Sequence, residues 1–378
     1  MISKLPNTGT SIFTTMSLLS AQHGALNMAQ GFPDFDVSQE LIDRVYFHMN
    51  KGRNQYPPSA GIPAFREALA AMHQHHFGTS HDPDKEITVT SGATEALFST
   101  ISALVYEGDE VIVFDPAYDS YEPVIDLQKA KAIHLKLSDE DFSVNWEEVK
   151  SVISERTRAI IVNSPHNPTG AVLSETDLLA LQKIAVDNDL FVISDEVYHH
   201  IVFDGKKHGS VLQYPELAKR SVAIFSFGKT FHTTGWKLGY AVAPAEITAE
   251  IRKIHQFVTF TTHTPSQFAL ADFVGNSANY EYLPSFFQQK RDLFLDGLKG
   301  SRFEWNPTSG TYFQLVRFDK ISKEADTDMA NRLTREFKLA TIPVSVFFED
   351  GHDASYLRVC FAKEDETLVR AAEIMQKI

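Results

Sequence analysis

Six short runs of apolar residues recur through the middle of the chain, separated by helical or polar stretches. Each run is short enough for one strand and apolar on both faces, which is typical of buried parallel strands. Parallel neighbours must be joined by long crossovers, usually helices, such as the helical pattern at 94–106. The pattern therefore predicts an α/β fold with a parallel sheet, whose strands we expect at 86–90, 111–114, 131–137, 159–164, 190–195 and 221–227.

The pattern changes after Pro284, where a long amphipathic stretch precedes a mixture of strand-like and helix-like segments. We expect strands at 311–318 and 355–362 and a helix near 326–338, which together indicate a smaller α+β domain. The first 40 residues are interpreted as an extended arm with turns at 7–9 and 31–34. The predicted organisation is an arm that forms part of the small domain (1–40), a large domain (41–281) and a small domain (282–378).

The overall composition narrows the class of protein. The chain has 378 residues, a formal net charge of −14 and one cysteine, Cys360. An acidic chain disfavours nucleic acid and anionic membranes as partners, and no run of about 18 apolar residues is present to span a bilayer. The N-terminus is too polar for a secretory signal, and a single cysteine fits a reducing compartment. We expect a cytoplasmic enzyme that does not bind nucleic acid or membranes.

Small residues mark the point where the first predicted strand turns into a helix. In the segment Thr90-Ser91-Gly92-Ala93-Thr94, backbone N–H groups can approach an anion closely, and a helix N-terminus favours negative charge. The segment is therefore a candidate phosphate site. An ordinary helix cap, made by the side chain of Ser91 or Thr94, is the alternative.

Two further candidates follow later strands. Asn167 lies in a rigid turn, Asn163–Gly170, at the end of one strand, where α/β sheets place their ligands. Asp195 ends another buried strand, and a buried carboxylate requires a cation such as a protonated pyridine nitrogen. Tyr198 could donate a hydrogen bond to the same ring. The alternatives are a structural turn at Asn167, a capping Asp195 and a core Tyr198.

Lys229 follows the last predicted strand and is flanked by small and aromatic residues. Desolvation lowers the pKa of a lysine and makes its neutral amine a nucleophile for a carbonyl group. Ser226 and Lys237 bracket it with a hydroxyl group and a second cation that suit a phosphate. A solvated surface lysine is the alternative.

Arg358 stands alone among apolar residues in the strand-like run 355–362. A guanidinium group in such a place needs an anionic partner, and a substrate α-carboxylate bound bidentately would satisfy it. An ion pair with an Asp or Glu of the protein is the alternative.

Taken in order along nearly the whole chain, these motifs resemble one family. GFPDF, NQYPPSAG, SGATEAL, DPAYDSY, NSPHNPTG, SDEVY, SFGKT, GWKLGY and LRVCFA are similar to the class I/II aminotransferases of pyridoxal-5′-phosphate (PLP) fold type I. The methionine aminotransferases and their kynurenine (glutamine) aminotransferase relatives are the most similar groups, and the motifs QGFPDF and ITVTSGATEAL favour the methionine group. The resemblance implies an aspartate aminotransferase-like fold, with a large domain built on a mostly parallel seven-stranded sheet and a smaller α+β domain.

The resemblance also implies a role for each candidate residue. Lys229 is the Schiff-base lysine and acid–base group, and Asp195 pairs with the pyridine nitrogen. The remaining expected contacts are Tyr198 and Asn167 with the ring oxygen, Tyr118 with the ring face, Gly92, Ala93, Thr94, Ser226 and Lys237 with the phosphate, Arg358, Asn167 and Gly31 with the substrate carboxylate, and Tyr56 from the second subunit of a homodimer with shared active sites. Lys237 stands where many relatives carry arginine, so we expect slightly looser cofactor retention.

The expected reaction moves the amino group of methionine, or of a similar apolar or aromatic L-amino acid, to a 2-oxo acid by ping-pong kinetics through pyridoxamine phosphate. Residues 255–267 hold no second arginine for a side-chain carboxylate, whereas Phe32, Phe257 and Phe260 suggest an apolar pocket or, equally, core packing. No histidine spacing requires a metal. A cysteine-conjugate C–S β-lyase and a kynurenine/glutamine aminotransferase remain the alternatives.

Overall fold

The computed structural model describes residues 2–6 and 8–378 and is built around a seven-stranded sheet with the order β2-β8-β7-β6-β5-β3-β4. All neighbouring strands are parallel except at β8, which is antiparallel to β2 and β7. The strands are β2 (Ile87–Thr90), β3 (Glu110–Asp115), β4 (Lys131–Lys136), β5 (Thr157–Asn163), β6 (Phe191–Asp195), β7 (Ser221–Ser226) and β8 (Gly239–Val242). Each of the six predicted runs is a strand, so the predicted mostly parallel seven-stranded fold is confirmed.

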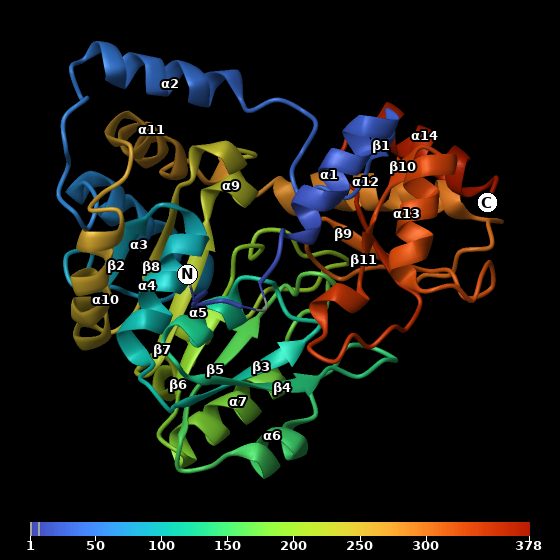
Figure 1. Cartoon of the computed structure of the whole chain (residues 1–378). Coiled ribbons are helices and arrows are strands. Elements are labelled where there is room, and N and C mark those ends of the chain that lie inside the picture. The colour runs from blue at the N-terminus through green and yellow to red at the C-terminus, as the bar shows by residue number, and fades with distance from the viewer. Residues whose placement is uncertain (1, 7) are drawn as a thin grey trace.

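The sheet separates two hydrophobic cores because successive strand residues point to opposite faces. Val111, Val113 and Ile161 belong to one core, whereas Ile112 and Phe114 belong to the other. The first core is covered by α4, α5 and α10, and the expected helix at 94–106 is α4, shifted two residues towards the N-terminus (Figure 1). The helices of this part are α2 (Gln39–Asn50), α3 (Pro63–Phe77), α4 (Gly92–Leu104), α5 (Tyr121–Leu127), α6 (Trp146–Val152), α7 (Glu175–Asp187), α8 (Pro215–Ala218), α9 (Phe227–Thr230), α10 (Ala245–Val258) and α11 (Thr264–Val274), with 3₁₀ turns at Val211–Gln213, Thr234–Trp236 and Ser277–Asn279.

The remaining elements form a second group around a three-stranded antiparallel sheet of order β11-β12-β9. They are α12 (Leu283–Leu298), β9 (Phe313–Arg317), α13 (Asp326–Glu336), β10 (Leu339–Ala340), β11 (Ile342–Pro343), a 3₁₀ turn at Ser345–Phe347, β12 (Tyr356–Cys360) and α14 (Asp365–Met375). The expected strands at 311–318 and 355–362 and the helix near 326–338 are all present. The strand β1 (Leu26–Asn27) pairs with β10, so the N-terminal segment joins this group (Figure 1). The domain boundaries themselves stay a prediction.

The prediction of an extended N-terminal arm is wrong, because Ile12–His23 forms the helix α1. Ser11 caps its first turn by accepting a hydrogen bond from the Thr14 amide, and Gly24 ends it in the left-handed conformation. The Ser- and Thr-rich sequence of α1 is only weakly amphipathic, so its helical period was not visible. Of the turn expected at 7–9, Asn7 lies outside the described residues, whereas 31–34 is irregular as expected.

Two kinds of feature, a membrane-spanning helix and a metal-binding cluster, are absent from the described residues. No helix there combines the length and the apolar character needed to cross a bilayer. No cluster of three or more histidine, cysteine or acidic side chains is arranged there to hold a metal ion.

Candidate active site

A cavity of about 200 Å³ opens at the carboxyl edge of the large sheet, where β5, β6 and β7 end beside the N-terminus of α4. Ligands of open α/β sheets bind at this edge. Twelve of the sequence-predicted residues line it, namely Gly31, Phe32, Gly92, Ala93, Thr94, Tyr118, Asn167, Asp195, Tyr198, Ser226, Lys229 and Lys237. The fold therefore brings together in one place residues that are up to about two hundred positions apart.

Lys229 lies in the short helix α9 directly after β7, and its amine faces the cavity. Nζ lies 3.4 Å from the carbonyl oxygen of Gly31. Burial lowers the pKa of Lys229 to about 8, an effect that the nearby Arg358 reinforces and Asp195 opposes. A substantial neutral fraction is therefore present near neutral pH, as a nucleophilic or basic amine requires. A solvated surface lysine, the alternative considered from sequence, does not describe this position.

Asp195 is the last residue of β6 and is 4% exposed. Burial raises the pKa of its carboxyl group to about 6, although two hydrogen bonds oppose the rise. These come from the Tyr121 hydroxyl, 2.7 Å from Oδ2, and from the Val197 amide, 3.3 Å from Oδ1. A buried carboxylate whose present hydrogen-bond donors are neutral is suited to accept a further hydrogen bond from a protonated, cationic ring nitrogen.

Sequence reasoning missed Tyr121. It lies three residues after Tyr118 in the DPAYDSY motif, at the start of α5, where its hydroxyl reaches Asp195 on β6. Only its spacing from Tyr118 could have drawn attention to it. Tyr118 itself lines the cavity, and burial raises its pKa to about 12, so its phenol stays neutral.

The opposite end of the cavity suits an anion. The first amides of α4 have no acceptor within the helix, and its first three residues line the cavity. Gly92 has a φ of 72°, and a Cβ atom there would lie 3.3 Å from Lys237 Nζ, which is itself 3.5 Å from the Thr94 hydroxyl. Ser91 occupies the N-cap position, yet its side chain makes no capping hydrogen bond, so the simple cap does not account for this segment.

Arg358 is 1% exposed on β12, among neutral groups. Its Nη1 donates to the Asn167 Oδ1 at 2.8 Å and its Nη2 to the Ala29 carbonyl oxygen at 3.0 Å. The guanidinium carbon lies 3.9 Å from the Phe313 ring centroid, and Nε has no partner. Within the described residues no carboxylate pairs with it, so the alternative of an intraprotein ion pair is not found, and the group suits the carboxylate of a ligand.

Three aromatic residues discussed from sequence lie outside this cavity. Tyr56 is 84% exposed, Phe257 is 85% exposed and Phe260 is 45% exposed, and the rings of Tyr56 and Phe260 meet edge to face at 5.5 Å. Phe32 alone of the proposed pocket phenylalanines lines the cavity. The roles given to Tyr56 and Phe260 stay predictions, because within one chain neither residue reaches the site.

These residues fit PLP. The helix end with Lys237 provides an anion cradle for the phosphate, and the buried Asp195, whose hydrogen-bond donors are neutral, offers a partner for a protonated ring nitrogen. Lys229, whose amine has a lowered pKa, would hold the cofactor's carbonyl carbon, and Tyr118 offers a flat side chain for the ring.

Comparison with known proteins agrees with this geometry. The family model for aminotransferase class I and II matches residues 24–375. The chain is 48% identical to methionine aminotransferase of Escherichia coli over 377 residues, covering 100% of this chain and 98% of the relative. It is 32% identical to kynurenine–oxoglutarate transaminase of Dictyostelium discoideum, covering 98% of this chain and 94% of the relative. The crystal structure of YbdL from Escherichia coli, which identifies a methionine aminotransferase function, superposes with a TM-score of 0.98 and covers 100% of this chain and 99% of that one.

Both the full-length similarity and the shared fold extend to relatives that are named for several different amino donors. The order of the motifs, the sheet and the cavity all follow the pattern of a PLP-dependent family. The chain belongs to the class I and II aminotransferases.

Proposed function

We propose that this aminotransferase moves the amino group of methionine, or of a similar apolar or aromatic L-amino acid, to a 2-oxo acid. The observation that carries the proposal is Arg358, a buried cation with no anionic partner among the described residues, beside a lysine with a lowered pKa. Phe13 and Phe313 surround its guanidinium group. A carboxylate bound there brings the rest of an amino acid into apolar surroundings.

When bound, PLP supplies an electron sink for the negative charge left on Cα after deprotonation. The protein then has three tasks. The neutral Lys229 amine removes the Cα proton and returns it, and its pKa of about 8 suits both directions near neutral pH. Arg358, held by Asn167, binds the α-carboxylate and orients the Cα–H bond towards Lys229. Asp195, held by Tyr121, keeps a positive charge on the ring nitrogen.

The decisive experiment follows the visible absorbance of the PLP-loaded protein as L-methionine is added without an acceptor. Loss of the visible band, with pyridoxamine phosphate and the 2-oxo acid of methionine formed in equal amounts, is the expected result. An unchanged band would remove methionine from the proposal. Parallel lines in initial-rate plots against both substrates would support ping-pong kinetics, and intersecting lines would contradict them.

The β-lyase alternative is less favoured, because the full-length relatives are named as transaminases. Release of pyruvate and ammonia from a cysteine conjugate, with no oxo acid present, would restore it. A kynurenine preference is tested in the same assay by competition between kynurenine and methionine. Substrate preference is then the ratio of the two kcat/KM values.

We also propose that the protein forms a homodimer with shared active sites and that it is located in the cytoplasm. The dimer is supported by three aromatic side chains that stay exposed in one chain, Tyr56, Phe257 and Phe260. The cytoplasmic location rests on composition, namely a single buried cysteine and an acidic surface. Light scattering at several protein concentrations tests the dimer, with twice the chain mass as the expected result.

A further inference from the structure

Tyr312 is a fully buried residue just before β9, outside the large sheet, and no role in the reaction has been given to it so far. Its hydroxyl donates a hydrogen bond of 2.7 Å to the carbonyl oxygen of Gly31. The same oxygen lies 3.4 Å from Lys229 Nζ. One backbone carbonyl therefore connects a buried phenol with the amine that carries out proton transfer.

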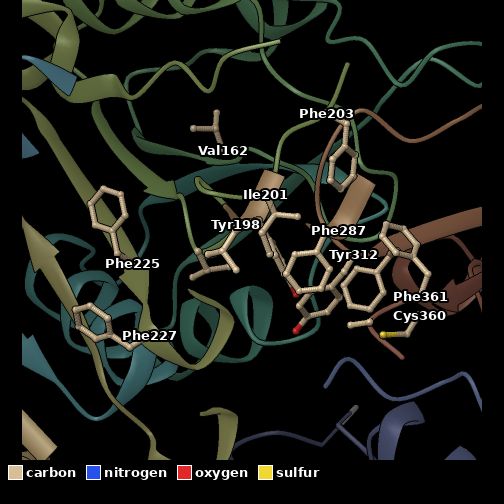
Figure 2. Close-up of a cluster of buried hydrophobic side chains, with 14 of the residues drawn as sticks. Val162, Tyr198, Ile201, Phe203, Phe225, Phe227, Phe287, Tyr312, Cys360 and Phe361 are labelled. Atoms are coloured by element: carbon tan, nitrogen blue, oxygen red, sulfur yellow. The ribbon is translucent and has the colours of Figure 1, made fainter. Parts of the chain in front are cut away.

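The ring of Tyr312 is fixed on several sides. It meets the Tyr198 ring edge to face, with centroids 5.1 Å apart, and the Phe287 ring at 5.7 Å (Figure 2). Lys229 Nζ lies 5.6 Å from its centroid and 5.5 Å from that of Tyr198, so the amine is close to both rings. A phenol packed in this way cannot swing away, and its hydroxyl holds whatever it bonds.

The neighbouring residue Phe313 packs closely against Gly31 itself. Phe313 packs under the guanidinium group of Arg358, and a Cβ atom at Gly31 would come within 2.8 Å of its ring. Glycine at position 31 thus lets the backbone approach this ring closely, while Tyr312 sets the direction of the Gly31 carbonyl. Two neighbouring residues therefore contact both functional cations: Tyr312 lies beside Lys229, and Phe313 packs on Arg358.

We propose that Tyr312 is a positioning residue that holds the Gly31 carbonyl against the Lys229 amine, and so fixes that amine whenever it is not covalently engaged. The proposal rests on the proposed function of Lys229 and assigns no chemistry to Tyr312 itself. A carbonyl acceptor stabilises the protonated amine more than the neutral one, because the charged ammonium group donates the stronger hydrogen bond to it. Releasing the carbonyl should therefore lower the pKa of the amine and misplace it for proton transfer.

The test is Tyr312→Phe, which removes one hydroxyl and keeps the ring packing. The matched control is Tyr280→Phe, since Tyr280 is also buried but packs on His200, away from the cavity. We expect kcat with the preferred amino acid to fall about tenfold in Tyr312→Phe, with KM and cofactor affinity changed less than about threefold, because an interaction made in the transition state is lost. Unchanged kcat, or a fall shared equally by the control, would overturn the proposal.

A second readout does not depend on catalysis. In cofactor-free protein, the pH dependence of acylation of Lys229, followed by mass spectrometry of its peptide, gives the pKa of the amine. We expect the midpoint to move down by about half a pH unit in Tyr312→Phe, a threefold change in the ionisation constant, and to stay in place in the control. An unchanged or raised midpoint would overturn the positioning role. Absence of transaminase activity in the wild type would instead refute the proposed function and leave this titration valid.

A double-variant cycle separates the two routes by which Tyr312 could act. If it acts through Gly31 and Lys229, its effect on kcat adds to that of Tyr198→Phe on a logarithmic scale. If the effect disappears in the Tyr198→Phe background, Tyr312 acts by supporting Tyr198, and the proposed route is wrong. Thermal denaturation of every variant checks that each compared protein is folded.

Discussion

The polar wall of the proposed active site, made of Lys229 and Asp195 at the cavity with Arg358 nearby, differs from the exposed aromatic residues Tyr56, Phe257 and Phe260 (the aromatic group) in how complete it is within one chain. In the wall, the polar atoms of Lys229 and Asp195 are held by neighbouring groups, and Arg358 lacks only an anion. In the aromatic group, two rings are more than four-fifths exposed. The wall is therefore organised by the fold of a single chain, whereas most of the surface of Tyr56 and Phe257 stays uncovered within it.

This difference predicts which substitutions should change activity or stability strongly and which should change them little. Buried charged groups interact through a medium of low polarity, so a single change there alters energies by several kcal/mol. Exposed rings are already in contact with water in a single chain, so replacing one should change the stability of that chain little. If such a ring contributes to association with another chain, the effect of replacing it should depend on protein concentration. Each prediction below tests one side of this comparison.

The largest effect is expected for Lys229→Ala. Removing the amine takes away both the nucleophile and the proton carrier, so kcat should fall by about 10³-fold or more. Stopped-flow or steady-state assays with methionine measure the loss, while equilibrium dialysis should still detect bound PLP. The control is Lys253→Ala, an exposed lysine on α10 that pairs with Glu250 on the same helix. Normal turnover by Lys229→Ala would contradict the assignment.

Arg358→Lys tests the other cation of the wall. Lysine keeps the charge but loses the fork of donors that reaches both Asn167 and a carboxylate, so kcat/KM for methionine should fall about 10²-fold. The control is Arg335→Lys at the end of α13, a position with no part in the cavity. Equal losses in the two variants would show that Arg358 is not a carboxylate site.

Asp195→Asn should stabilise the cofactor-free protein. The folded-state pKa is raised from 3.8 to about 6, so the folded protein binds more protons between these values and loses stability as the pH rises through this window. Above it the buried carboxylate costs up to about 3 kcal/mol, which asparagine avoids. Thermal denaturation without cofactor should show the variant more stable than the wild type at pH 7.5, and the difference should vanish near pH 4.

With PLP bound, the order of stability should reverse, because the carboxylate then has a cationic partner. If the cofactor-free variant were more stable than the wild type by the same amount at every pH, the stabilisation would have to come from packing rather than from charge. A variant that was less stable at every pH would contradict the assignment of a raised pKa.

The smallest effect is expected on the aromatic group. Phe257→Ser removes an 85% exposed ring at the end of α10, so the stability of a single chain should change by less than about 0.5 kcal/mol. If this surface joins two chains, dilution should dissociate the variant at a higher concentration than the wild type, and activity should fall with it. Light scattering and activity measured over the same dilution series give the result; identical curves would remove this surface from the interface.

Much of the fold could be predicted from the sequence because its signals are local. Every apolar run in the middle of the chain became a strand, since buried parallel strands are continuous in sequence. β8 and α1 did not stand out. β8 is a four-residue strand that contains a glycine, and α1 has a Ser- and Thr-rich sequence whose helical period is masked.

The candidate site was also largely visible, because many of its residues directly follow strands and carry unusual chemistry for their surroundings. Asp195, Asn167 and Lys229 stand out as polar groups at the ends of apolar runs. Tyr121 and Tyr312 did not, because a tyrosine among apolar residues is unremarkable until its hydroxyl partner is known. Those partners, Asp195 and Gly31, lie 74 and 281 positions away.

By itself, then, the sequence determined six of the seven strands of the large sheet, the family and the residues with reactive groups, since these depend on local periodicity and on residue type. Only the tertiary structure decided which groups meet. The pairing of Arg358 with Asn167, the support of Asp195 by Tyr121 and the junction of Tyr312, Gly31 and Lys229 all join distant segments. Such contacts depend on how elements far apart in the sequence pack together, and no local pattern records that packing.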